Sequence, residues 1–198
     1  MAFHVVFLGS PEFAAISLQK LLETGATVAG VVTAPDRPKG RELKLTPTPV
    51  RVLAEKAGVP VLTPADVNAP EALAAIRACK PNVIVVAAFG QILKQELLDM
   101  PPLGCVNVHP SLLPEYRGAA PIQRAFMDGK AGTGVTICKM VRKLDSGDIL
   151  LTQTEPIRPE DTYGTLHDRL ARLGADLLVE AMKSLASGKE RPVPQDDA

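Results

Sequence analysis

Asn107 and His109 are the residues whose types and spacing first suggest chemistry. Both lie in the otherwise apolar run 105–109, which reads Cys-Val-Asn-Val-His. Side chains in a β-strand alternate between the two faces, so residues two apart point to the same side. Pro110 and Pro114 follow, and proline ends a strand and stiffens the loop after it. The pattern predicts an amide and an imidazole side by side at the end of a buried strand, where they either bond to backbone groups or serve a ligand.

Asp145 is a candidate for a third group in the same site. It lies in the polar stretch 143–148, whose residues favour a turn. A carboxylate beside an imidazole fixes the ring's orientation and favours its charged form, and an amide N–H stabilises an oxyanion. No serine or cysteine nucleophile accompanies the three groups, so they suit direct transfer of an acyl group from a donor to an amine. This interpretation requires that the three side chains meet, which the sequence leaves open.

Other catalytic and binding motifs find little support. Residues 9–11 lack the glycine pattern of dinucleotide and phosphate loops, and Ser111 lacks the context of a serine hydrolase. His4 and His167 stand alone, which favours surface or packing roles. The three histidines and three cysteines show no metal-ligand spacing, so no metal site is predicted.

Composition and charge set the broad class. The chain has 198 residues, 46% hydrophobic and 22% charged, which indicates one globular domain. Its 22 basic and 22 acidic residues balance, so binding to a nucleic acid would need a local patch. The proline-rich stretch 35–51 offers one, with five basic residues against two acidic ones. Scattered cysteines, short apolar runs and a start without signal-peptide features favour a reduced cytoplasmic protein without a membrane span.

The elements that must position these residues alternate along the chain. Apolar runs predict strands at 4–8, 28–32, 59–62, 82–88, 105–109, 133–140 and 149–154. Helical spacing and start and stop signals predict helices at 12–24, 49–58, 70–79, 93–98, 121–128 and 162–188. Residues 33–50 show no periodicity and are expected to form a long loop. The order predicts an α/β fold with an open, doubly wound, mostly parallel sheet, which binds ligands at the carboxyl ends of its strands.

Two motifs together carry a family resemblance over nearly the whole chain. Asn107-x-His109-Pro110-Ser111-Leu112-Leu113-Pro114, followed by Leu144-Asp145-Ser146-Gly147-Asp148, resembles the tetrahydrofolate-dependent formyltransferases. The stretches 117–123 (Arg-Gly-Ala-Ala-Pro-Ile-Gln) and 35–41 are similar to the branch that acts on initiator methionyl-tRNA. The resemblance implies a Rossmann-like formyltransferase fold, 10-formyltetrahydrofolate as the donor, and the α-amine of initiator methionyl-tRNA as the acceptor.

The resemblance also implies residue roles. Asn107 would bind the formyl oxygen, His109 would act as an imidazolium or proton carrier, and Asp145 would hold His109 and manage protons. The residues implied to contact the folate are Ser111, Leu112, Leu113, Pro114, Phe89, Gly90, Gln91, Ile92 and Val141. Those implied to reach the tRNA are Arg41, Lys39 and Lys44.

The resemblance further sets expectations for domains and leaves alternatives. Members of the tRNA branch carry a second, C-terminal domain, so residues 1–189 are expected to be the catalytic domain and 190–198 the start of a linker. A monomer is expected. The usual pattern of that branch differs at Lys139, Arg142 and Lys143. These three cationic residues would either form a solvated edge or contact RNA phosphates or a polyglutamate tail on the folate. A sugar-nucleotide amine or another small amine as acceptor, hydrolysis of the formyl donor, and a non-catalytic folate-binding module remain alternatives.

Overall fold

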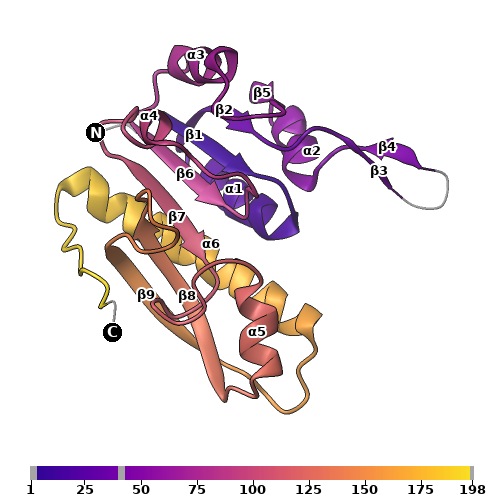
Figure 1. Ribbon diagram of the computed structural model, residues 1–198, viewed down its shortest axis with the longest axis vertical. Coiled ribbons are helices and arrows are strands. Elements are labelled where there is room, and N and C mark those ends of the chain that lie inside the picture. The colour runs from indigo at the N-terminus through magenta and orange to yellow at the C-terminus, as the bar shows by residue number, and fades with distance from the viewer. Residues whose placement is uncertain (1–3, 40–42, 197–198) are drawn as a thin grey trace.

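The computed structural model describes residues 4–39 and 43–196, built around one seven-stranded sheet (Figure 1). The strand order is β5-β2-β1-β6-β7-β8-β9. The first five strands are parallel, β8 pairs antiparallel with β7, and β9 pairs antiparallel with β8. The strands are β1 (His4–Gly9), β2 (Thr27–Val32), β5 (Val61–Leu62), β6 (Val83–Ala87), β7 (Cys105–His109), β8 (Gly132–Lys139) and β9 (Ile149–Pro156). The predicted doubly wound, mostly parallel sheet is confirmed.

Helices cover both faces of the sheet, as strands without polar alternation require. The helices are α1 (Glu12–Glu23), α2 (Pro49–Lys56), α3 (Pro70–Ala78), α4 (Gln95–Leu98), α5 (Pro121–Met127) and α6 (Tyr163–Ser187). Val5 and Phe7 of β1 pack with α1, α2 and α6, whereas Val6 and Leu8 pack with α3 and α4 on the other face. Most predicted boundaries agree within two residues.

Helix α6 passes behind β7 and β8, directly under the Asn107 strand (Figure 1). Its start is held by a reciprocal capping box between Thr162 and Thr165, and its end by Gly188 in the left-handed conformation. Gly174 allows the close approach, because a Cβ there would lie 2.9 Å from Val108 Cγ1.

The stretch 33–50 contains a two-stranded antiparallel ribbon, so the prediction of a loop without regular structure is wrong there. Strands β3 (Arg37–Lys39) and β4 (Lys44–Thr46) pair and extend away from the main sheet (Figure 1). Strands of three residues are too short for alternation to be visible in the sequence. Pro38 is tolerated because each strand of a two-stranded ribbon has a free edge. The ribbon carries Leu45 with 65% of its surface exposed.

The last described residues return to the sheet. Val193 forms an antiparallel bridge with Ile149 at the start of β9, through two backbone hydrogen bonds of 2.8 and 2.9 Å. Residues 191–196 therefore lie against the loop that precedes β9.

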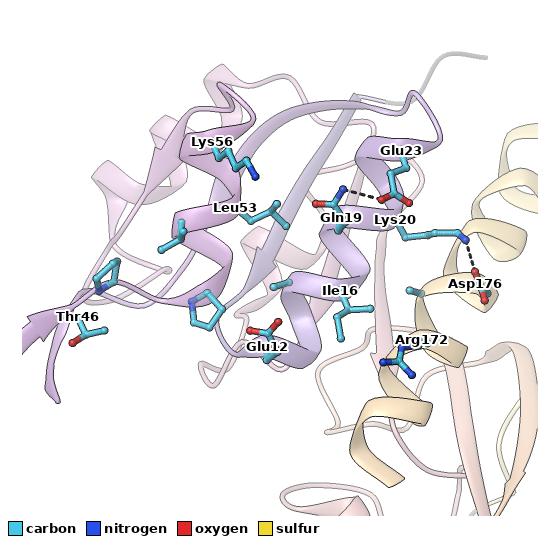
Figure 2. A pocket seen from close by; sticks show the side chains of 15 residues that line it. Glu12, Ile16, Gln19, Lys20, Glu23, Thr46, Leu53, Lys56, Arg172 and Asp176 are labelled. Atoms are coloured by element: carbon cyan, nitrogen blue, oxygen red, sulfur yellow. Dashed lines mark hydrogen bonds and ion pairs between the residues drawn. The ribbon is translucent and has the colours of Figure 1, made fainter. Parts of the chain in front are cut away.

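A groove of about 820 Å³ lies between α1, α2 and α6 (Figure 2). Ile16 and Leu53 contribute apolar surface, and Lys20 of α1 forms an ion pair of 2.6 Å with Asp176 of α6. Because these helices cover the face of the sheet opposite to Asn107, the groove is separate from the residues that suggested chemistry. Among the described helices, none is long and apolar enough to cross a membrane.

Candidate active site

Side chains alternate between the two faces of β7, and this alternation places Asn107 and His109 on the same face. Val106 and Val108 point into the core under α6, so Asn107 and His109 point to the opposite face. On that face the loops 110–120 and 140–148 take the place of a covering helix. Asn107 keeps 8% of its surface exposed and His109 keeps 5%, so both lie in a nearly closed site.

Asp145 meets both residues, as the sequence interpretation requires. Its Oδ1 accepts a hydrogen bond of 3.2 Å from Asn107 Nδ2, and its Oδ2 lies 3.7 Å from His109 Nδ1. The backbone N–H of Gly118 donates to the same Oδ2 at 2.8 Å. The Asp145 side chain is 10% exposed. An amide, an imidazole and a carboxylate thus form one cluster, although Asp145 lies 38 residues beyond Asn107.

The imidazole of His109 is held from both sides. Its Nε2 lies 2.9 Å from the carbonyl oxygen of Tyr116, opposite to the nitrogen that faces Asp145. Both neighbours are acceptors, so a doubly protonated ring satisfies both contacts and a neutral ring satisfies one. Tyr116 is itself anchored, because its hydroxyl donates to Asp128 Oδ2 at 2.8 Å. Contacts at both ring nitrogens therefore fix the orientation of the His109 ring.

The loop backbones around the cluster take unusual conformations. Asp145, Tyr116 and Ala120 have positive φ angles of 47°, 56° and 57°, which non-glycine residues adopt at a cost of about 1–3 kcal/mol each. Gly147 is forced to be a glycine for another reason, since a Cβ there would overlap the carbonyl oxygen of Lys139. This concentration of strained backbone is typical of functional sites.

A cavity of about 130 Å³ opens beside the cluster. Asn107 and Asp145 form one side, and Gln91, Ile92 and Val141 lie among the remaining lining residues. Pockets for whole ligands usually measure 300–1,000 Å³, so this cavity fits only part of one, such as a flat ring. The cavity brings three of the residues predicted to contact folate next to the cluster.

A second cavity of about 610 Å³ lies on the other side of Gln91. Phe89 and Gly90, two more predicted folate contacts, line this one together with Ser10, Arg37 and several prolines at the base of the β3–β4 ribbon. Gln91 is common to both cavities. The two spaces are therefore neighbours at the carboxyl end of β6.

The loop 111–114 is shaped by Thr136, which sequence reasoning missed. Thr136 Oγ1 donates to Ser111 O at 2.7 Å and accepts from Leu113 N at 3.1 Å. Ser111 is fully buried and donates to Glu115 O, and Leu112 packs so closely on Gly134 that a Cβ there would overlap its side chain. These contacts fix the loop before Pro114; its contact with folate stays a prediction. In the sequence, Thr136 is marked only by being a polar residue among positions 134, 136 and 138, which share one face of the strand.

The predicted basic cluster is divided in the structure. Lys44 is exposed at the start of β4, and Lys39 ends β3. Arg41 lies outside the described residues. Arg51 is instead engaged by Asp36 at 2.9 Å and Glu55 at 2.8 Å. Arg37 and Lys44 are thus exposed basic residues on the β3–β4 ribbon, which extends away from the main sheet (Figure 1).

One further residue beside the cluster, Gln195, had no signal in the sequence. Gln195 accepts hydrogen bonds from Arg117 and donates to the carbonyl oxygens of Asp145 and Gly147. It comes from a stretch of polar and proline residues without periodicity, so composition pointed only to a linker.

The residues around the cluster include one thiol, that of Cys138. Burial, with a further contribution from the charge of Asp145, raises the pKa of the neighbouring Cys138 thiol to about 12, so the nucleophilic thiolate is suppressed. Within residues 4–39 and 43–196 there is no group of three or more His, Cys, Asp or Glu residues placed to hold a metal ion.

Comparison with known proteins gives a consistent result. The family model described as formyl transferase matches residues 3–182. The chain is 54% identical over 98% of its length to a methionyl-tRNA formyltransferase of Geobacillus sp. (strain WCH70), and 52% identical over 98% to that of Moorella thermoacetica. It spans 61% and 63% of those two relatives, about three-fifths of their length.

Solved structures show the same fold. The glycinamide ribonucleotide transformylase 1 of Symbiobacterium toebii superimposes with a TM-score of 0.78 at 22% identity, covering 97% of this chain and 93% of that one. With a family model matched over nearly the whole chain and the same fold in the structure, the chain belongs to the formyl transferase family.

Proposed function

We propose that this chain is the catalytic domain of a methionyl-tRNA formyltransferase, which moves a formyl group from 10-formyltetrahydrofolate to the α-amine of initiator methionyl-tRNA. The observation that carries the chemistry is the nearly buried cluster of Asn107, His109 and Asp145. The names of the relatives at 50–54% identity support this acceptor. Reaction with tRNA implies a cytoplasmic enzyme.

The geometry suggests how the three side chains share the reaction. The acceptor amine attacks the formyl carbon, the carbonyl oxygen becomes an oxyanion, and the bond from carbon to N10 of the folate then breaks. Asn107 Nδ2 carries two N–H groups, of which one bonds to Asp145, so the second is available to the oxyanion. The proton lost by the attacking amine is taken up through His109 and Asp145 and returned to N10 as the folate leaves.

The two neighbouring cavities suggest where the substrates lie. The smaller one, beside Asn107 and Val141, would take the flat pterin ring of the donor. The larger one, lined by Ser10, Pro35 and Arg37, would take the aminoacyl end of the acceptor. Because both cavities include Gln91, a donor and an acceptor bound in this way meet beside the cluster.

The β3–β4 ribbon would contact the tRNA backbone. Lys44 is exposed there, and Lys39 and Arg41 belong to the same stretch. Lysine and arginine bind phosphate with a strong dependence on salt. The ribbon rises from the base of the larger cavity, so it would reach nucleotides next to the aminoacyl group.

The test compares acceptors. Formyl transfer is measured with methionyl initiator tRNA, glycinamide ribonucleotide and a nucleotide-linked amino sugar, using residues 1–198 alone and the same residues extended by the C-terminal region of a relative. Of the three acceptors, only methionyl initiator tRNA is expected to be formylated, and its KM is expected to be lower with the extended protein. Transfer to a small amine instead, or release of formate without an acceptor, contradicts the proposal.

Two variants refine the assignment. Asn107→Ala is expected to lower kcat about 10²–10³-fold, the usual effect of losing an oxyanion donor. Folate binding that survives this loss separates catalysis from a purely binding role. Lys44→Ala is expected to raise the KM for tRNA without changing the KM for folate, whereas Lys183→Ala, which replaces another exposed lysine, on α6, leaves both unchanged.

A further inference from the structure

The amide of Gln195 lies between the two loops that enclose His109. Its Nε2 donates to the carbonyl oxygens of Asp145 at 2.9 Å and Gly147 at 2.7 Å. Its Oε1 accepts from Arg117 Nε at 3.1 Å and Nη2 at 2.8 Å. A primary amide offers two donors and two acceptor lone pairs, and all four are used here. The side chain is thus matched to this position as a bridge.

The backbone of the tail brings this amide into register. Val193 and Ile149 exchange two backbone hydrogen bonds as an antiparallel bridge, and Ile149 is the first residue after the loop 140–148. Two residues on, Gln195 therefore lies beside that loop and not elsewhere on the surface. Val193 itself is 59% exposed, so the anchoring comes from its backbone more than from burial of its side chain.

The two loops joined by Gln195 are the ones that orient the cluster. The loop of Arg117 supplies the carbonyl oxygen of Tyr116 to His109 and the N–H of Gly118 to Asp145. The other loop carries Asp145 itself, with a positive φ that the surroundings must maintain. A bridge between the loops limits how far Asp145 moves away from His109.

We propose that Gln195 is a positioning residue for the formyl transfer, which ties the Asp145 loop to the Arg117 loop and keeps Asp145 directed at His109. The inference rests on the function proposed above and adds a residue outside the motifs that suggested it. It requires the amide itself. Methionine fills the same volume without hydrogen bonds, and glutamate keeps the contact with Arg117 but turns a carboxylate toward two carbonyl oxygens.

The kinetic test uses Gln195→Met and Gln195→Glu, with Gln153→Ala, an exposed glutamine of β9, as the control. Both Gln195 variants are expected to lower kcat about 10- to 100-fold, since hydrogen bonds that hold the reactive geometry are lost, with little change in the KM for the acceptor. The control keeps the parent kcat. Full activity in either Gln195 variant overturns the inference.

A double variant tests whether Gln195 acts through Asp145. In Asp145→Asn the carboxylate that Gln195 keeps directed at His109 is already gone, so adding Gln195→Met is expected to lower kcat less than twofold further. Independent effects multiply instead, because their free energies add. A combined loss equal to the product of the single losses therefore overturns the proposed route of action.

Hydrogen exchange of the folded protein separates this inference from the proposed function. Amides in residues 140–148 are expected to exchange at least tenfold faster in Gln195→Met than in the parent or in Gln153→Ala. If the parent formylates no acceptor, the proposed function fails while this measurement still decides whether Gln195 holds the loop. Unchanged exchange in an active protein contradicts the positioning role alone.

Discussion

Replacing Asp145 by asparagine keeps the shape of the side chain and removes its charge. In the structure the two carboxylate oxygens accept one hydrogen bond each, from Asn107 Nδ2 and from Gly118 N, and one of them faces His109. An asparagine amide has only one oxygen. Whichever way it is turned, its NH₂ group points at another N–H donor, so either Asn107 or Gly118 loses its partner.

The size of the effect follows from these contacts. A hydrogen bond to a charged group contributes about 1.5–3 kcal/mol, against about 0.5–1.5 kcal/mol between neutral groups, and an orphaned buried donor costs about 1–3 kcal/mol. The variant weakens one bond and breaks another, so the reactive geometry loses about 3–4 kcal/mol. At 1.36 kcal/mol for each factor of ten, this corresponds to a 10²–10³-fold lower kcat.

Stability is expected to respond much less than rate. Asp145 is 10% exposed, and removing a nearly buried charge relieves a desolvation cost that partly offsets the lost hydrogen bonds. The assay is single-turnover formyl transfer to methionyl initiator tRNA, with urea unfolding of the same sample and Asp99→Asn, an exposed carboxylate, as the control. A folded Asp145→Asn protein with more than a third of the parent rate refutes the assigned role.

Three further outcomes are expected. Gly147→Ala moves the loop, because its Cβ would overlap Lys139 O; kcat measured by formyl transfer falls at least tenfold, whereas a parent-like kcat contradicts the tight contact. Arg169→Met lowers the melting temperature at pH 7, because its hydrogen bonds lower the pKa of Asp161. A carboxyl group whose pKa is lowered by folding stabilises the protein above its unfolded pKa of about 3.9, and this stabilisation is lost as pH falls. The difference in melting temperature between the two proteins is therefore expected to shrink below about pH 4, and a constant difference refutes the linkage. Cys138, whose pKa is raised to about 12 by burial, reacts with iodoacetamide at pH 8 only after unfolding, as mass spectrometry of the labelled peptide tests.

The sequence predicts most of the main sheet because its strands are buried on both faces and read as unbroken apolar runs. The 105–109 strand and the shared face of Asn107 and His109 follow from alternation alone. The β3–β4 ribbon escapes prediction because it is short, exposed and interrupted by Pro38, so neither burial nor period marks it.

The cluster is predictable only in part. Motif resemblance suggested Asp145 as the partner of His109, but the loop conformation that brings it there depends on Gly118 and on the close approach of Gly147 to Lys139. Gln195 had no local signal at all, because its role arises from backbone pairing with residues far back in the chain. Long-range contacts of this kind are not encoded in spacing or composition.

The contact between Gln195 and Asp145 also sets an order of events during synthesis. Domains fold as the chain emerges from its N-terminus, at about 5–20 residues per second, so the 50 residues that separate the two take roughly 3–10 s to be made. Strand β9 and helix α6 are also made in that interval, so every described helix and strand precedes the residue that bridges the Asp145 loop to Arg117. The nascent protein therefore has its fold before it has a fastened site, and premature release before residue 195 is expected to yield a folded chain whose Asp145 loop lacks that bridge.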